Sequence, residues 1–82
     1  MTEQTIILNW FIRQREAGNH DFFSVKYILK SLENEGVLTN GNTRMQINRL
    51  YAYNYLDVIN PEAWKRRFRV RDKYVKDYKM ED

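Results

Sequence analysis

The chain has 82 residues, enough for one small domain, with no cysteine and a single histidine, His20. This composition excludes disulfides, thiol catalysis and cysteine-based zinc sites, and it leaves no histidine cluster to hold a metal. A core of this size rarely encloses the deep pocket that a cofactor enzyme needs, so we expect neither an enzyme nor a bound cofactor or small molecule. Residues 1–82 are interpreted as one domain, with a core over about 3–75 and a tail over 76–82.

The positive charge of the chain is concentrated in its C-terminal part. The net charge is +3, but residues 1–63 hold six basic and seven acidic side chains, whereas residues 64–79 hold eight basic and two acidic ones. Such a basic block is typical of a surface that meets a polyanion, although a solvated charged strand would also explain it.

The sequence predicts no membrane segment. No apolar run approaches the roughly 20 residues of a membrane span. The first residues also lack the basic region and apolar core of a signal peptide. We therefore expect a cytoplasmic, nucleoid-associated protein.

Residues 2–17 are predicted to form the first helix. Apolar side chains recur there at helical spacing, and Gly18 can take the left-handed conformation that ends a helix. His20 is expected to be a surface residue in the polar turn that follows. Phe22 and Phe23 come next and could form one or two rungs of a strand.

A second helix is predicted to begin after Ser24, which is a good N-cap, and to end before Gly36. Residues 39–42 are rich in turn formers and are predicted to be a turn. The third helix is then expected to begin at Thr43, because Thr43 and Gln46 match the capping-box pattern.

The third helix is predicted to end near Tyr53, since Asn54 tolerates the left-handed conformation. A competing interpretation extends this stretch as strand, because Tyr51, Tyr53 and Tyr55 alternate with period two. We favour the helix, because the apolar residues before Tyr51 have helical spacing.

Two strands are predicted in the C-terminal part, over residues 56–59 and around residues 67–71, joined by a turn at 60–63. In the second strand, apolar side chains occupy one face and Arg67, Arg69 and Arg71 the other. Three arginines in a row would repel one another unless a polyanion lay across them.

This order of elements resembles the winged helix-turn-helix fold of DNA-binding regulators. The resemblance is carried by Phe23-Ser24, Val25, Ile28, Leu29, Leu32, Gly36-Val37-Leu38, Thr43, Ile47, Leu50, Tyr55-Leu56-Asp57-Val58 and Phe68-Arg69-Val70. Family members commonly have glycine before the first wing strand, where this chain has Asn54, and the turn at 39–42 is longer than in the tightest members. The resemblance implies an α+β fold with three helices and a C-terminal two- or three-stranded β-wing.

The resemblance also implies a small, sequence-specific double-stranded DNA-binding protein that regulates transcription. The third helix would enter the major groove, and the basic wing would grip the backbone or the minor groove. Gln46, Asn48 and Arg49 project away from the predicted core and are the candidate base-reading residues, because amide and guanidinium groups pair bidentately with adenine and guanine. The candidate backbone and wing contacts are Thr43, Arg44, Lys65, Arg66, Arg67, Arg69, Arg71 and Lys73.

Other partners are considered beside DNA. A winged-helix protein-interaction module, such as an adapter or inhibitor, could use the same basic wing and exposed tyrosines on a protein, and RNA is a third option. Trp64 at the hairpin tip is expected to pack back on the third helix. A homodimer is also considered, because the chain has more tyrosines than one small core needs; these are Tyr53, Tyr55, Tyr74 and Tyr78.

Overall fold

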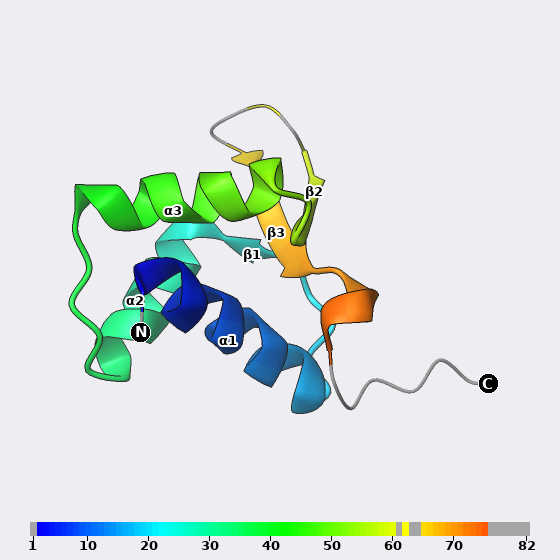
Figure 1. Ribbon diagram of the computed structural model, residues 1–82, viewed down its shortest axis with the longest axis horizontal. Coiled ribbons are helices and arrows are strands. Elements are labelled where there is room, and N and C mark those ends of the chain that lie inside the picture. Colours follow the sequence, from blue (N-terminus) through cyan, green and yellow to red (C-terminus); the bar gives the residue numbers. More distant parts are fainter. Residues whose placement is uncertain (1, 61, 63–64, 76–82) are drawn as a thin grey trace.

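The computed structural model describes residues 2–60, 62 and 65–75, which form an α+β arrangement of helices and one antiparallel sheet (Figure 1). The elements are α1 (Glu3–Glu16), β1 (Phe23–Ser24), α2 (Val25–Asn34), α3 (Gly41–Ala52), β2 (Leu56–Ile59), β3 (Arg67–Val70) and the short 3-10 helix η2 (Asp72–Tyr74). None of the helices in these ranges is long and apolar enough to cross a membrane. The expectations for Trp64, Tyr78 and the tail over 76–82 lie outside the described residues.

Local capping explains the first two helices, which match their predicted ranges. Thr2 accepts a hydrogen bond from the Thr5 amide at the start of α1, and Gly18 takes a φ of +91° just after its end. Ser24 accepts from the Tyr27 amide at the start of α2. A hydroxyl oxygen in this position satisfies an N–H that has no partner within its own helix.

The third helix begins two residues earlier than predicted. Asn40 is its N-cap, and the Asn40 side chain accepts from the Asn42 amide at 2.8 Å. Thr43 lies in the first turn, where its hydroxyl accepts from the Asn40 amide at 3.0 Å. The prediction of Thr43 as the cap was therefore wrong, and the predicted turn over 39–42 is already helical from Gly41 on. The reason is that Asn is a better N-cap than Thr and that Thr43 completes the capping box from inside the helix.

The C-terminal end of α3 matches its prediction. The helix ends at Ala52, and Asn54 has a φ of +68°. The competing interpretation, in which the strand extends back through Tyr51 and Tyr53, was wrong. The strand period starts only at Leu56, after the left-handed residue has turned the chain.

The sheet has the order β1-β3-β2, and both neighbouring pairs are antiparallel. Phe68 on the central strand is opposite Phe23 on one side and Val58 on the other. Phe68 and Val70 are fully buried, whereas Arg69, between them, faces away from the core. Apolar and arginine side chains therefore alternate along β3 as predicted. The third strand of the sheet is β1, which lies far away in the sequence.

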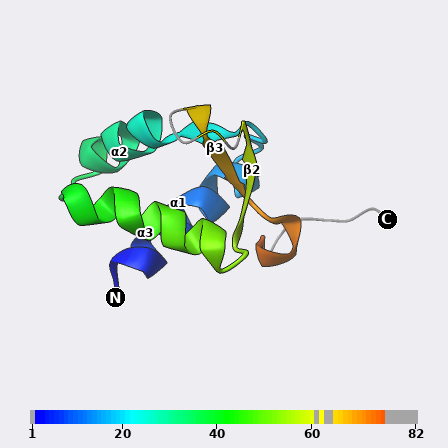
Figure 2. The ribbon, with the colours of Figure 1, turned by 90° about the horizontal axis from the view of Figure 1, so that it is seen from above.

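The core lies between the inner face of this sheet and the helices. In Figure 2, α2 and α3 run side by side and α1 crosses beneath α3. Trp10 and Phe11 of α1 are buried together with Ile47 and Leu50 of α3. The Trp10 indole N–H donates to the Ser31 hydroxyl at 3.0 Å, so this buried polar group is satisfied.

Arg15 fixes the end of α1 to the C-terminal end of β3. Its side chain is 3% exposed, and its Nη1 and Nη2 atoms donate to the Val70 carbonyl at 3.0 Å and the Asp72 carboxylate at 2.6 Å. Its Nε donates to His20 Nδ1 at 3.0 Å. Sequence reasoning missed this role of Arg15.

Candidate nucleic-acid interface

The outer face of α3 carries several of the predicted contact residues. Ile47 and Leu50 point into the core, as expected, and Met45 and Arg49 are exposed on the opposite side. Met45 is 41% exposed. From residue 36 to residue 56 the sequence contains no acidic side chain, so the whole helix and its flanks lack negative charge.

Two predicted residues of α3 are turned away from this outer face. The Thr43 residue is 1% exposed, and its hydroxyl donates to Glu3 Oε2 at 2.6 Å. Gln46 is half-buried and accepts a hydrogen bond from Gln4 Nε2 at 2.7 Å through its side-chain oxygen. Both contacts reach α1, because the 100° step per residue places these two positions beside the buried stripe. Thr43 and Gln46 thus join α3 to α1 in this structure.

Asn48, which is also a candidate base-reading residue, contacts the basic segment before β3, formed by Lys65 and Arg66. Arg66 Nη1 donates to Asn48 Oδ1 at 3.2 Å, and the Arg66 guanidinium lies 5.7 Å from the centre of the Tyr51 ring. Asn48 Nδ2 also donates to the Arg44 carbonyl at 3.2 Å. The structure therefore brings together two groups of residues that are far apart in the sequence, the outer face of α3 and the start of the basic strand.

Further basic side chains border α3 on both sides. Arg44 is exposed and lines a shallow groove against α2 together with Lys26 and Lys30. Near the other end of the helix, Lys65 and Arg67 line a depression of about 300 Å³ together with Ser24, Asn60 and Arg66. Glu33 also lines the first groove, and it accepts a hydrogen bond from the Thr39 hydroxyl.

The arginine row on the outer face of β3 has partners within the fold. Arg69 Nη1 donates to the His20 carbonyl at 2.8 Å, and its guanidinium lies 4.3 Å from the centre of the Phe22 ring. Arg71 Nε lies 3.1 Å from Asp57 Oδ1, in an ion pair that is not aligned as a hydrogen bond. Arg69 and Arg71 therefore do not need an external polyanion to offset their charges, because the segment before β1 supplies a carbonyl and a ring and β2 supplies a carboxylate. The inference that the row needs a polyanion was wrong for these two residues and stays a prediction for Arg67.

The arginine row on β3 also extends away from α3. In Figure 1 the strand β3 starts near the C-terminal half of α3 and descends toward η2 and the end of α1. Arg67 stands at the near end and is exposed. Lys73, in η2, lies at the far end, where its Nζ is 5.1 Å from the centre of the Tyr74 ring. The predicted basic wing therefore divides into a part beside α3 and a part beside α1.

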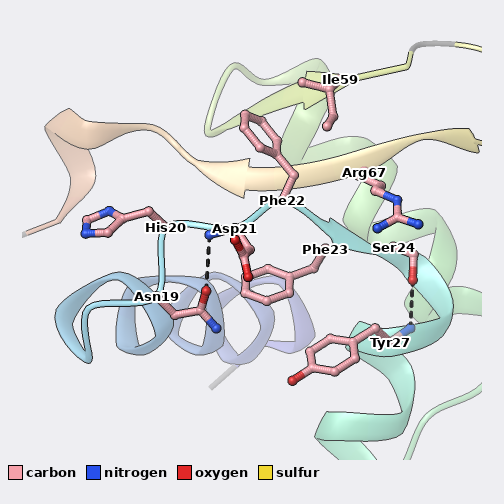
Figure 3. A pocket seen from close by; sticks show the side chains of 9 residues that line it. All are labelled: Asn19, His20, Asp21, Phe22, Phe23, Ser24, Tyr27, Ile59 and Arg67. Carbon is pink, nitrogen blue, oxygen red and sulfur yellow. Dashed lines mark hydrogen bonds between the residues drawn. The ribbon is translucent and has the colours of Figure 1, made fainter.

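A depression on the β1 edge of the sheet was missed by sequence reasoning. It measures about 590 Å³, and Phe22, Tyr27, Ile59 and Arg67 are among its lining residues. In Figure 3, Phe22 and Ile59 project to one side of the sheet and Phe23 to the other, toward α1. The adjacent phenylalanines could have revealed it, because consecutive strand residues point to opposite faces, so one of the pair must face outward.

The tyrosines that motivated a homodimer have mixed surroundings. Tyr55 and Tyr74 pack against each other with ring centres 4.8 Å apart, so this pair contributes to packing within the chain. Tyr53 is 59% exposed. The homodimer stays a prediction, supported among the described residues chiefly by Tyr53.

The described residues contain no group of three histidine, aspartate or glutamate side chains that could hold a metal ion. Comparison with known proteins does not place the chain in a family. The chain matches no protein-family model, and no curated protein or solved structure matches it. A functional proposal for this chain therefore has to rest on its geometry and charge.

Proposed function

We propose that the chain is a small, sequence-specific double-stranded DNA-binding protein of the winged helix-turn-helix type that regulates transcription. In this proposal α2 and α3 form the helix-turn-helix, and the β2–β3 hairpin is the wing. Three helices followed by an antiparallel hairpin are compatible with that fold. The α3 helix would lie in the major groove, and the basic segment before β3 would lie on the adjacent backbone or minor groove.

The observation that carries this proposal is the contact between Arg66 and Asn48. Because Arg66 Nη1 lies 3.2 Å from Asn48 Oδ1, the basic segment is next to the outer face of α3. Arg44 and Arg49 are exposed on the same helix, and no acidic residue occurs between 36 and 56. Each basic side chain that neutralises a phosphate releases a counterion, so a group of exposed basic side chains on and beside α3 favours a nucleic acid.

Among the candidate base-reading residues, Arg49 has the most accessible position. Its residue is exposed and belongs to the face of α3 that points away from the core. A guanidinium can donate two hydrogen bonds to a guanine in the major groove, and apolar groups such as the exposed Met45 can contact a thymine methyl. To contact a base, Gln46 would first have to break its hydrogen bond with Gln4.

One observation favours the alternative of a protein-interaction module. Tyr27 and Ile59 are 53% and 42% exposed, and both border the depression at the β1 edge. Exposed aromatic and apolar side chains of this kind are enriched in protein interfaces. An adapter or inhibitor would use this depression together with Arg67, which lines it.

Selection from a random pool of duplex DNA tests the DNA proposal. We expect a preferred sequence to emerge, because α3 offers base-reading groups. The Arg49→Ala substitution should then weaken binding to the selected duplex by about 1–3 kcal/mol, the value of one good bidentate contact. Binding to a random duplex should weaken less. Equilibrium titrations of both duplexes at one salt concentration measure the difference.

The matched control is Arg13→Ala, which removes the same charge from an exposed position on α1, where Arg13 pairs with Glu35 at 2.8 Å. It should leave the preference between the two duplexes unchanged. If selection yields no duplex that the chain binds, the DNA proposal is wrong and the protein-interaction module replaces it. If Arg49→Ala weakens both duplexes in the same ratio, Arg49 does not read a base.

A further inference from the structure

Arg66 precedes β3 in the sequence, but its guanidinium lies against α3. It contacts Asn48 at 3.2 Å through Nη1, and it lies 5.7 Å from the centre of the Tyr51 ring. Asn48 and Tyr51 are three residues apart in one helix, so they share one side of it. Both contacts therefore hold the long side chain of Arg66 at the same edge of α3.

The amide of Asn48 is engaged at both of its polar ends. Nδ2 donates to the Arg44 carbonyl at 3.2 Å, and Oδ1 accepts from Arg66. A carbonyl only accepts and a guanidinium only donates, so a single orientation of the amide satisfies both. The bond to its own helix thus turns the oxygen of Asn48 toward Arg66.

These contacts conflict with base reading by Asn48. An asparagine that pairs with adenine uses both amide ends, accepting from N6 and donating to N7. Asn48 could do this only by giving up its bonds to Arg44 and Arg66. The guanidinium of Arg66 carries its N–H donors in a planar fork, a geometry that suits phosphate.

We propose that Asn48 is a positioning residue for Arg66 and does not read a base. It holds the Arg66 guanidinium at the edge of α3, where Arg66 meets a DNA phosphate beside the groove that the helix occupies. This inference rests on the proposed DNA binding and adds a role within it. An arginine that is already ordered loses less conformational entropy when it binds, so the contact from Asn48 strengthens a phosphate contact without adding charge.

A double-mutant cycle tests this role through the salt dependence of DNA binding. Asn48→Ala, Arg66→Ala and the double variant are titrated with the selected duplex and with a random duplex over a series of salt concentrations. Arg66→Ala should flatten the log–log salt slope by about one unit, because one phosphate contact is lost. Asn48→Ala removes no charge, but an Arg66 that is no longer held contacts the phosphate in a smaller share of the bound complexes, so the slope should flatten by less than one unit.

The affinity for DNA should also fall in each single variant. Asn48→Ala should weaken both duplexes by the same factor, about two- to tenfold, which corresponds to ordering one long side chain. It should have no further effect once Arg66 is replaced. Asn9→Ala makes the same chemical change at an exposed position on α1 and should leave affinity and slope unchanged. Thermal unfolding checks each variant, and Arg66→Gln replaces Arg66→Ala in the cycle if the double variant does not fold.

Three results would overturn the inference while leaving the DNA proposal intact. Asn48→Ala could weaken the selected duplex alone, which would make Asn48 a base-reading residue. Its effect could be equally large without Arg66, or it could leave the salt slope unchanged. If the unmodified chain binds neither duplex, the proposed DNA function itself is wrong, and the role of Asn48 in it is rejected as well.

Discussion

Arg13 and Arg15 show how differently two identical side chains two residues apart can behave. Arg13 is more than half exposed and pairs with Glu35 across the surface, whereas Arg15 is buried. The buried guanidinium donates to a histidine nitrogen, a backbone carbonyl and a carboxylate. Such a group is tolerated in an interior only because its donors are matched by acceptors.

This contrast predicts two very different mutational effects. Arg15→Met should lower the free energy of unfolding by about 2–4 kcal/mol, because the buried Val70 carbonyl loses its donor and Asp72 loses its partner. Arg13→Met should cost less than about 1 kcal/mol, as is usual for an exposed ion pair. Urea denaturation of the two variants measures both values. Equal losses would mean that Arg15 does not stabilise the junction of α1 and β3.

At the scale of elements, the ends of the helices follow local chemistry. Gly36, after α2, has a φ of +86°, and Gly41 is the first residue of α3 and has no left-handed backbone. A methyl group built on either glycine would meet nothing within 4 Å. The two positions therefore differ in backbone conformation alone.

The same substitution should have opposite effects at these two glycines. Gly36→Ala should destabilise the protein by about 1–2 kcal/mol, because an L-residue is strained in the left-handed region. Gly41→Ala should stabilise it by about 0.4–1 kcal/mol, because alanine restricts the unfolded chain without straining the helix. Thermal and urea unfolding report the sign of each change. A loss of stability in Gly41→Ala would show that α3 does not begin where the structure places it.

At the scale of the whole molecule, the basic residues at the two ends of β3 lie on separate surfaces. Lys65, Arg66 and Arg67 line one depression near α3. Lys73 lines a different one beside α1, in which Glu16 is also present. A DNA duplex seated on α3 would therefore meet the first surface and miss the second.

The salt dependence of DNA binding distinguishes these surfaces. Arg67→Ala should flatten the log–log slope by about one unit, because a phosphate contact is lost. Lys73→Ala removes the same charge but should leave the slope unchanged, because Lys73 lies beside α1. The two variants are compared on one duplex over the same salt range. If both flatten the slope equally, DNA extends along the whole of β3 and the contact surface proposed for the hairpin is too small.

The amino-acid sequence by itself determined the three α-helices, the two strands β2 and β3, and their order. The extents of α1 and α2, the end of α3 and the alternation in β2 and β3 depend on residues within about one helical turn, so periodicity and capping suffice to predict them. The start of α3 is local as well, and it was misplaced because two overlapping capping patterns competed. The outer face of α3 and the exposure of Arg49 follow from the same periodicity.

The tertiary structure decided which side chains of the candidate site remain on its surface. Thr43 and Gln46 are turned toward α1 by partners 40 and 42 residues away in the sequence, and Arg15 meets Asp72 across 57 residues. Asn48 acquires its contact with Arg66 across 18 residues. A local pattern contains no information about such partners, because they become neighbours only when the helices and the sheet close around a common core.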